Sequence, residues 1–346
     1  MTQDEKFMLR ALELASLGFG SVSPNPMVGC VIVHDDEIIG EGYHEEYGKS
    51  HAEPNAVASV KNPDLLTSST VYVTLEPCAH WGKTPPCANL LVEKKVKKVV
   101  IGTVDTNPLV GGKGIQILKD AGIEVVIGVL DERVRAENRR FFTFMEKKRP
   151  YVILKWAQTK DGFIARENYD SKWISNPYSR QMVHKWRSEE DGIMVGTLTA
   201  KYDNPQLNVR AWEGKNPLRI VIDRKLTLDG DLHLFDQSQA TICYNQEMEE
   251  KSENLERVKL QAKFDINEIL KDLYDRKIQS LIVEGGAKLL NNFIQENLWD
   301  EARVFTGRVQ FGNGISAPKL VGARVEEEFE IIGDRLSIWR NTSKLN

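Results

Sequence analysis

The sequence predicts a two-domain α/β protein, and three observations lead to this class. The length of 346 residues exceeds what one hydrophobic core usually serves, which favours two domains. Strand and helix patterns alternate along both halves, as is typical of layered α/β domains. The polar segment 146–150 ends in proline between a Phe-rich helix and a new apolar strand, which indicates a linker. We therefore expect domains at 1–147 and 148–346.

The N-terminal half begins with an amphipathic helix. Thr2 and Glu5 can form a capping box, and apolar residues then recur with helical spacing up to Gly18. Segments 28–34 and 37–43 predict a hairpin that turns at 35–36. The remaining expected elements are a helix over 51–60, a strand over 70–75, a helix from about residue 85, a strand over 98–103, a helix over 113–121, a strand over 123–129 and a helix over 131–144.

The C-terminal half starts with the apolar strand 151–156. Asn176-Pro177 is typical of a helix start and predicts a helix over 177–188. The other expected elements are strands over 192–196, 218–222 and 240–244, a helix over 266–276, a strand over 280–284, a helix over 286–297, a strand over 301–306 and a terminal hairpin over 329–332 and 336–339.

Composition argues against several function classes. A formal net charge of -4 does not suit a protein that neutralises many phosphates along a nucleic acid. The acidic N-terminus does not resemble a secretion signal, and no apolar run approaches a membrane span, so we expect a cytoplasmic protein with no membrane partner. The four cysteines are too sparse for a disulfide framework, which leaves packing, catalysis or metal binding as their roles.

Three residues form a candidate metal site. His51 precedes Cys78, and Cys87 follows after eight intervening residues. One imidazole and two thiolates give Zn²⁺ three protein ligands and leave a fourth position for water, as in catalytic sites. We expect one zinc ion per chain. His80 lies between the two cysteines, so a closed structural Cys2His2 site is the alternative.

Glu53 distinguishes these two alternatives. The zinc-deaminase pattern of His-x-Glu followed by Pro-Cys needs a glutamate that moves protons and does not bind the metal. Zinc lowers the pKa of bound water, so that hydroxide can attack an amidine carbon of a nucleobase-like ring. Taken alone, Glu53 is a carboxylate favoured at a helix start. Together with Pro77 and the three ligand candidates, it favours a catalytic site.

The second half carries weaker signals. Residues 280–288 and 191–199 each read as a strand that runs through glycine into a helix, where backbone N–H groups can receive a phosphate. Glycine at such turns is often only steric relief, and no Gly-x-Gly-x-x-Gly fingerprint is present. The residues therefore do not support a standard dinucleotide-binding domain.

Several longer motifs together resemble those of one protein family. The stretches 23–29, 42–48, 51–53 and 74–87 resemble the bifunctional riboflavin-biosynthesis deaminase/reductase family, and the match continues through 105–108 into 155–162, 195–210 and 283–286. The eight-residue spacer between the cysteines departs from the Pro-Cys-x-x-Cys of cytidine and tRNA deaminases. Thr106 and Pro54-Asn55 depart from the family pattern, which affects only local substrate contacts.

The resemblance implies a fold and a reaction for each half. It implies an N-terminal cytidine-deaminase-like three-layer domain and a C-terminal dihydrofolate-reductase-like domain. The first would remove an amino group from 2,5-diamino-6-ribosylamino-4(3H)-pyrimidinone 5′-phosphate. The second would use NADPH to deliver hydride to C1′ of the opened ribose. A homo-oligomer is also expected from the resemblance to deaminase-like folds.

The resemblance also assigns residues to roles. His51, Cys78 and Cys87 match the zinc ligands and Glu53 the proton shuttle. Substrate contacts in the first half are Asn25, His44, His80 and Lys83. Cofactor contacts are Ala157, Trp173, Thr199, Asp203 and a helix start formed by Gly286, Ala287, Lys288, Leu289, Leu290, Asn291 and Asn292. Substrate contacts in the second half are Lys155, Ser171, Arg187, Leu207, Arg210 and Glu284.

Some of these roles make physical sense, and others have alternatives. Arg187 and Arg210 can each fork onto a phosphate, and Glu284 can hydrogen-bond ribose hydroxyls. Lys155 can polarise an imine or form an ion pair. Two other functions stay open for the whole chain, namely a nucleic-acid base deaminase with an appended binding domain and a zinc-stabilised scaffold without catalysis.

Overall fold

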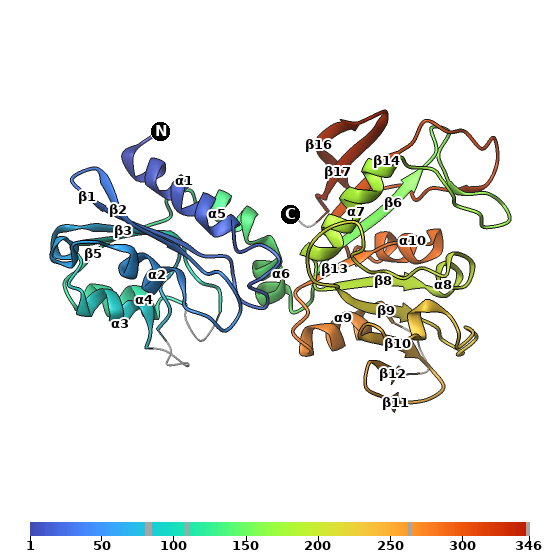
Figure 1. Cartoon of the computed structure of the whole chain (residues 1–346), viewed down its shortest axis with the longest axis horizontal. Helices are drawn as coiled ribbons and strands as arrows, with labels where there is room; N and C mark the ends of the chain where they lie inside the picture. Colours follow the sequence, from blue (N-terminus) through green and yellow to red (C-terminus); the bar gives the residue numbers. More distant parts are fainter. Residues whose placement is uncertain (80–84, 108–110, 262–264, 344–346) are drawn as a thin grey trace. The chain divides into compact units, whose positions relative to one another are not determined.

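The computed structural model describes residues 1–79, 85–107, 111–261 and 265–343. The chain divides into two compact units, Met1–Lys148 and Arg149–Asn346, which are described separately below (Figure 1). In the described part of the chain, none of the helices combines the length and the apolar character that crossing a bilayer requires.

The first unit is built on a five-stranded sheet in the order β2-β1-β3-β4-β5. The hairpin β1–β2 is antiparallel, while β3, β4 and β5 are parallel. The elements are α1 (Gln3–Ser16), β1 (Gly29–His34), β2 (Glu37–Tyr43), α2 (Ala52–Ser59), the 3-10 helix η1 (Pro63–Ser68), β3 (Thr70–Leu75), α3 (Cys87–Glu93), β4 (Lys98–Thr103), α4 (Lys113–Asp120), β5 (Glu124–Ile127), α5 (Asp131–Glu137) and α6 (Arg139–Lys147).

Helices cover both faces of this sheet because the strands are apolar on both sides. Along β1, Cys30 and Ile32 pack with α2, α3 and α4, whereas Val31 and Val33 pack with α1. This alternation follows from the two-residue period of a strand. The result is the three-layer α/β arrangement expected for this half (Figure 1).

One predicted helix of the first unit is wrong. The segment 131–144 is not continuous, because α5 ends at Glu137 and α6 begins at Arg139. Asn138 lies between them with φ −94° and ψ 24°, outside the helical range. The apolar periodicity spans the break without a Gly or Pro, so no local signal marks it.

The second unit contains a ten-stranded sheet in the order β11-β12-β10-β9-β8-β13-β6-β14-β17-β16. The seven strands from β12 to β14 are parallel, and β17 and β16 extend the sheet antiparallel. The ten strands of this sheet are β6 (Tyr151–Gln158), β8 (Gly192–Gly196), β9 (Leu218–Ile222), β10 (Thr241–Asn245), β11 (Glu250–Lys251), β12 (Leu255–Lys259), β13 (Ser280–Val283), β14 (Glu301–Thr306), β16 (Ala323–Ile331) and β17 (Asp334–Asn341). β7 (Phe163–Ala165) and β15 (Ile315–Ser316) pair in a separate two-stranded sheet.

Helices also cover both faces of the second sheet. They are α7 (Pro177–Glu189), α8 (Thr197–Asp203), α9 (Ile266–Asp275) and α10 (Ala287–Gln295), with the 3-10 helix η2 (His233–Phe235). Residues of α9 and α10 join one core cluster, and residues of α7 and α8 join the other. The helix start expected after the strand in 191–199 is the beginning of α8, whose end the sequence did not predict. The sequence placed the terminal hairpin over fewer residues than β16 and β17 occupy.

The strand order locates a crevice. The chain runs from β6 to β8 and then outward through β9, β10 and β12, and it later returns to insert β13 between β8 and β6. Ligands of open α/β sheets bind at the carboxyl ends of strands where the winding direction changes. The carboxyl ends of β8, β13 and β6 are therefore the expected ligand site of this unit.

Candidate functional sites

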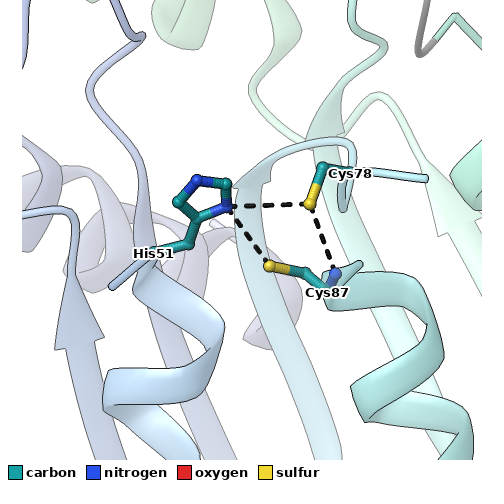
Figure 2. A group of neighbouring side chains, drawn as sticks. All are labelled: His51, Cys78 and Cys87. Atoms are coloured by element: carbon teal, nitrogen blue, oxygen red, sulfur yellow. Dashed lines mark hydrogen bonds between the residues drawn. The ribbon is translucent and has the colours of Figure 1, made fainter. Parts of the chain in front are cut away.

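The metal-site candidates converge in the first unit. His51 is the N-cap residue of α2, Cys78 follows the end of β3, and Cys87 is the first residue of α3. Their ligand atoms all lie within 4.8 Å of one another (Figure 2). Three separate segments thus bring together the ligands that the sequence singled out.

The spacing of these atoms fits zinc. Nδ1 of His51 lies 3.6 Å from Sγ of Cys78 and 3.4 Å from Sγ of Cys87. Tetrahedral coordination, with Zn–S of about 2.3 Å and Zn–N of about 2.1 Å, separates neighbouring nitrogen and sulfur ligands by about 3.6 Å. The backbone N–H of Cys87 also donates to Cys78 Sγ at 3.3 Å, which stabilises negative charge on that sulfur.

Glu53 lies in the first turn of α2, two residues after His51. Its side chain is buried, with the residue 2 % exposed. Burial, and then the neighbouring Cys78, raise the pKa of Glu53 to about 7. A carboxyl group in this position can be protonated or ionised near neutral pH, as a group that carries protons must be.

Asn25 and His44 form a polar pair beside the metal ligands. Nδ1 of His44 donates to the carbonyl of Ser50 at 3.0 Å, so Nε2 accepts from Nδ2 of Asn25 at 3.1 Å. The His44 and His51 rings meet edge to face, with centroids 5.4 Å apart. Asn25 and His44, two of the four predicted substrate residues of this unit, therefore lie at the metal site. His80 and Lys83 fall outside the described residues.

Glu76 is a site residue whose importance sequence analysis missed. Its buried carboxylate accepts backbone N–H groups from Asp105 at 3.3 Å, Gly112 at 3.0 Å, Gly114 at 2.9 Å and Ile115 at 3.2 Å. It immediately precedes Pro77-Cys78, so it ties the turn that carries a ligand to the start of α4. Its position within the stretch 74–87 is the signal that the sequence offered for it.

A largely buried ion cluster marks the crevice of the second unit. Glu284, directly after β13, accepts from Nε and Nη2 of Arg187 at 2.8 Å each. Nζ of Lys155 lies 3.6 Å from the same carboxylate. The predicted ion pair of Lys155 is thus present, and the guanidinium fork predicted to face a phosphate engages Glu284 in this structure.

A second layer of contacts supports this cluster. The backbone carbonyl of Asn208 accepts from Nδ1 of His184 at 2.9 Å and from Nη1 of Arg187 at 3.3 Å. The Asn208 side chain accepts from Nη1 of Arg210 at 3.0 Å. The two arginines therefore lie near each other through one loop. Sequence analysis overlooked His184, although it lies three residues before Arg187 on the same face of α7.

Some of the residues predicted to contact the cofactor lie close together in the structure. Oγ of Ser171 donates to Asp203 at 3.2 Å, and a Cβ built on Gly286 would lie 3.1 Å from Oγ1 of Thr199. Trp173 is largely exposed. Ala157 lies near the carboxyl end of β6, and the 286–292 segment begins α10.

Three of the predicted contact residues have buried side chains. Leu207, Leu289 and Leu290 are buried in the core clusters, so their side chains face the protein interior and not the crevice. Packing against the sheet explains this, because each lies on the apolar side of its segment. Any ligand contact from these residues comes from their backbone atoms.

The comparisons with known proteins agree with both sites. A model of the RibD C-terminal domain matches residues 150–331, and a model of the cytidine and deoxycytidylate deaminase zinc-binding region matches residues 1–103. The riboflavin biosynthesis protein RibD of Aquifex aeolicus is 39% identical over 334 residues, which is 95% of this chain and 93% of that protein. The chain belongs to the RibD family.

Further relatives give the same result along the whole chain. The RibD protein of Escherichia coli is 34% identical over 93% of this chain and 89% of its own length. The crystal structure of a diaminohydroxyphosphoribosylaminopyrimidine deaminase/5-amino-6-(5-phosphoribosylamino)uracil reductase from Thermotoga maritima superposes with a TM-score of 0.89, at 39% identity over 98% of this chain and 99% of that one. The predicted fold classes and the two enzyme activities, a deaminase and a reductase of riboflavin biosynthesis, are confirmed.

Proposed function

We propose that residues 1–147 deaminate 2,5-diamino-6-ribosylamino-4(3H)-pyrimidinone 5′-phosphate and that residues 148–346 then reduce its ribosyl group with NADPH. The main support is the cluster of His51, Cys78 and Cys87 with buried Glu53 beside it, in a RibD-family chain. The substrate is the one that the family resemblance implies, and the Thermotoga maritima relative is named as a diaminohydroxyphosphoribosylaminopyrimidine deaminase and a 5-amino-6-(5-phosphoribosylamino)uracil reductase.

In the deamination step, His51, Cys78 and Cys87 would hold zinc, which would activate a water molecule for attack on the ring carbon. Glu53 would relay protons from this water to the ring nitrogen and to the departing amino group, so that a C–O bond replaces the C–N bond and ammonia leaves. Asn25 and His44, joined at 3.1 Å, orient the pyrimidine ring. The tautomer of His44 is fixed by its bond to Ser50, so its Nε2 is an acceptor.

In the reduction step, NADPH supplies the hydride. A cofactor phosphate fits at the start of α10, where backbone N–H groups follow the Gly285-Gly286 turn and a side chain at Gly286 would approach Thr199. Arg187 and Arg210 attract the substrate phosphate, while Glu284 accepts from ribose hydroxyls. Lys155 and Arg187 hold Glu284 ionised.

We also propose that the protein is cytoplasmic. A second proposal is that it assembles as a homo-oligomer, as the resemblance to deaminase-like folds suggests. Light scattering after size-exclusion chromatography measures the number of copies. A monomer in that measurement contradicts the second proposal and leaves the two activities unaffected.

Replacing Glu53 with Gln tests the deamination proposal. We expect ammonia release to be lost while about one zinc ion per chain is retained, because Glu53 moves protons and does not bind the metal. Reduction of the deaminated substrate, followed through NADPH absorbance, continues as in wild type. Glu45→Gln, an exposed change in the same unit, is the matched control. Normal ammonia release by Glu53→Gln, or loss of its zinc, contradicts the assigned role.

A further inference from the structure

The break between α5 and α6 places one side chain in an unusual role. Asparagine is a favoured N-cap residue, because its side chain can accept from the first N–H groups of a helix. Asn138 occupies the N-cap position of α6 but makes no such bond. Its amide instead reaches a segment that lies 111 positions away in the sequence.

This distant contact has two hydrogen bonds. Oδ1 of Asn138 accepts from the backbone N–H of Met27 at 2.8 Å, and Nδ2 donates to the backbone carbonyl of Met27 at 2.9 Å. The primary amide thus pairs with the backbone as a neighbouring strand would. Asn138 is 3 % exposed, so water competes little for these groups.

The two hydrogen bonds from Asn138 to Met27, called the clamp below, fix the loop 23–27. Pro24 and Pro26 have no backbone N–H, so the segment 23–27 has few groups that can anchor it. The N–H of Asn25 already donates to the carbonyl of Val22 at 2.8 Å. The two bonds at Met27 therefore fix the end of the loop that presents Asn25.

The clamp leads directly to the deamination site. Asn25 donates to Nε2 of His44, whose ring lies edge to face against the metal-ligand candidate His51. The next residue after Met27 is also fixed, since the carbonyl of Val28 accepts from the N–H of His44 at 2.9 Å. This backbone bond holds Val28 in place, so a displacement of Met27 falls on the Asn25 side of the loop.

We propose that Asn138 is a positioning residue for deamination, which holds Asn25 in its substrate-binding position through the backbone of Met27. This inference rests on the proposed function, because it takes Asn25 as a substrate contact. Asn138 touches neither the metal ligands nor Glu53 through any bond described above. Its effect is on substrate binding.

The expected kinetic signature follows from that position. Asn25 binds the ring in the ground state and the transition state alike, and loss of such uniform binding raises KM while kcat is unchanged. We expect Asn138→Ala to raise KM for deamination about tenfold and to change kcat less than about twofold. Zinc content and reduction of the deaminated substrate are unchanged. A general loss of structure lowers kcat and zinc content together.

A double-mutant cycle on the full chain tests the route through Asn25. Ammonia release is measured for wild type, Asn25→Ala, Asn138→Ala and the double variant, with zinc content and reduction measured on each preparation. We expect Asn138→Ala to add little to KM once Asn25 is already Ala, because both changes remove one interaction. Asn62→Ala, which removes a side-chain cap elsewhere in the same unit, is the matched control and leaves KM at the wild-type value.

The outcomes separate the two proposals. Additive effects on KM, or a fall in kcat at constant KM, overturn the role of Asn138 while deamination itself stands. If Asn138→Ala loses zinc, Asn138→Asp enters the same cycle, because it keeps the size and the oxygen that accepts from Met27. Zinc loss by both variants assigns Asn138 to general stability and overturns the inference. Wild-type protein that releases no ammonia overturns the proposed function as well.

Discussion

Arg187 and Glu284 form a largely buried two-point ion pair, in which Nε and Nη2 each lie 2.8 Å from a carboxylate oxygen. Their side chains are 11% and 8% exposed. Burial raises the pKa of Glu284, but Arg187 and Lys155 outweigh it and bring that pKa down to about 2. With Lys155 at 3.6 Å, two cations share one anion. The excess positive charge suits a phosphorylated substrate.

Glu284→Gln is expected to destabilise the second unit by about 3–5 kcal/mol, because it leaves two buried cations without their shared anion. Reduction is lost as well, whereas deamination by the first unit continues. Denaturant unfolding followed by tryptophan fluorescence measures the effect, since Trp81 is the one tryptophan of seven outside this unit. Glu296→Gln, an exposed change in the same unit, leaves the midpoint unchanged. Equal midpoints for the two variants contradict the prediction.

Sequence analysis predicted best what depends on local pattern. The strands 192–196, 218–222 and 301–306 have the predicted bounds, because continuous apolar runs between turn residues suffice to mark them. The metal triad was predictable because histidine and cysteine are rare here and few other roles suit them. These signals need no knowledge of distant partners.

The features that sequence analysis missed depend on distant partners. Asn138 breaks a helix because its amide binds Met27, and no nearby residue records that contact. The sequence could not show that the Arg187 guanidinium binds Glu284 and not a phosphate, because the two residues lie 97 positions apart. The burial of the Leu207 side chain depends on distant core residues as well, so the sequence could not show that a ligand contact there would come from the backbone.

The stability of the second unit should fall as the pH drops from about 6.5 to about 4. Burial, and then Arg187 and Arg210, lower the pKa of His184 from 6.5 to about 4. Between these values the unfolded chain binds a proton that the folded chain does not, so acid favours unfolding. The slope contributed by one such group reaches at most about 1.4 kcal/mol per pH unit.

Unfolding midpoints measured from pH 4 to pH 7 test this slope. His184→Asn has no titrating ring, so we expect its curve to be flatter than that of wild type over this range. His233→Asn replaces an exposed histidine of the same unit and should keep the wild-type slope. A wild-type slope in His184→Asn assigns the pH dependence to other groups. Glu284 acts at lower pH, where its stabilisation is lost as the pH falls from about 4.5 towards 2.

Glu76→Gln is expected to loosen the metal site. The variant replaces one carboxylate oxygen with an amide NH2 that faces backbone donors such as those of Gly112 and Gly114. Losing charge-assisted bonds of this kind costs about 1.5–3 kcal/mol each. Because Glu76 adjoins Pro77-Cys78, we expect a lower unfolding midpoint for the first unit and faster zinc loss to a chelator. Glu93→Gln, at an exposed position in the same unit, serves as the control, and an unchanged rate of zinc loss in Glu76→Gln contradicts this role.

Gly286→Ala is expected to weaken NADPH binding without unfolding the second unit. The backbone of Gly286 has φ −66°, which alanine adopts without strain. The added Cβ would lie 3.1 Å from Oγ1 of Thr199, so one of the two must shift where the cofactor phosphate is proposed to bind. Titration of NADPH fluorescence should give a Kd about tenfold higher, equivalent to about 1.4 kcal/mol. Gly230→Ala, in the same unit with open space around its Cβ, should bind as wild type does. If Gly286→Ala also binds with wild-type affinity, the phosphate does not bind at the start of α10.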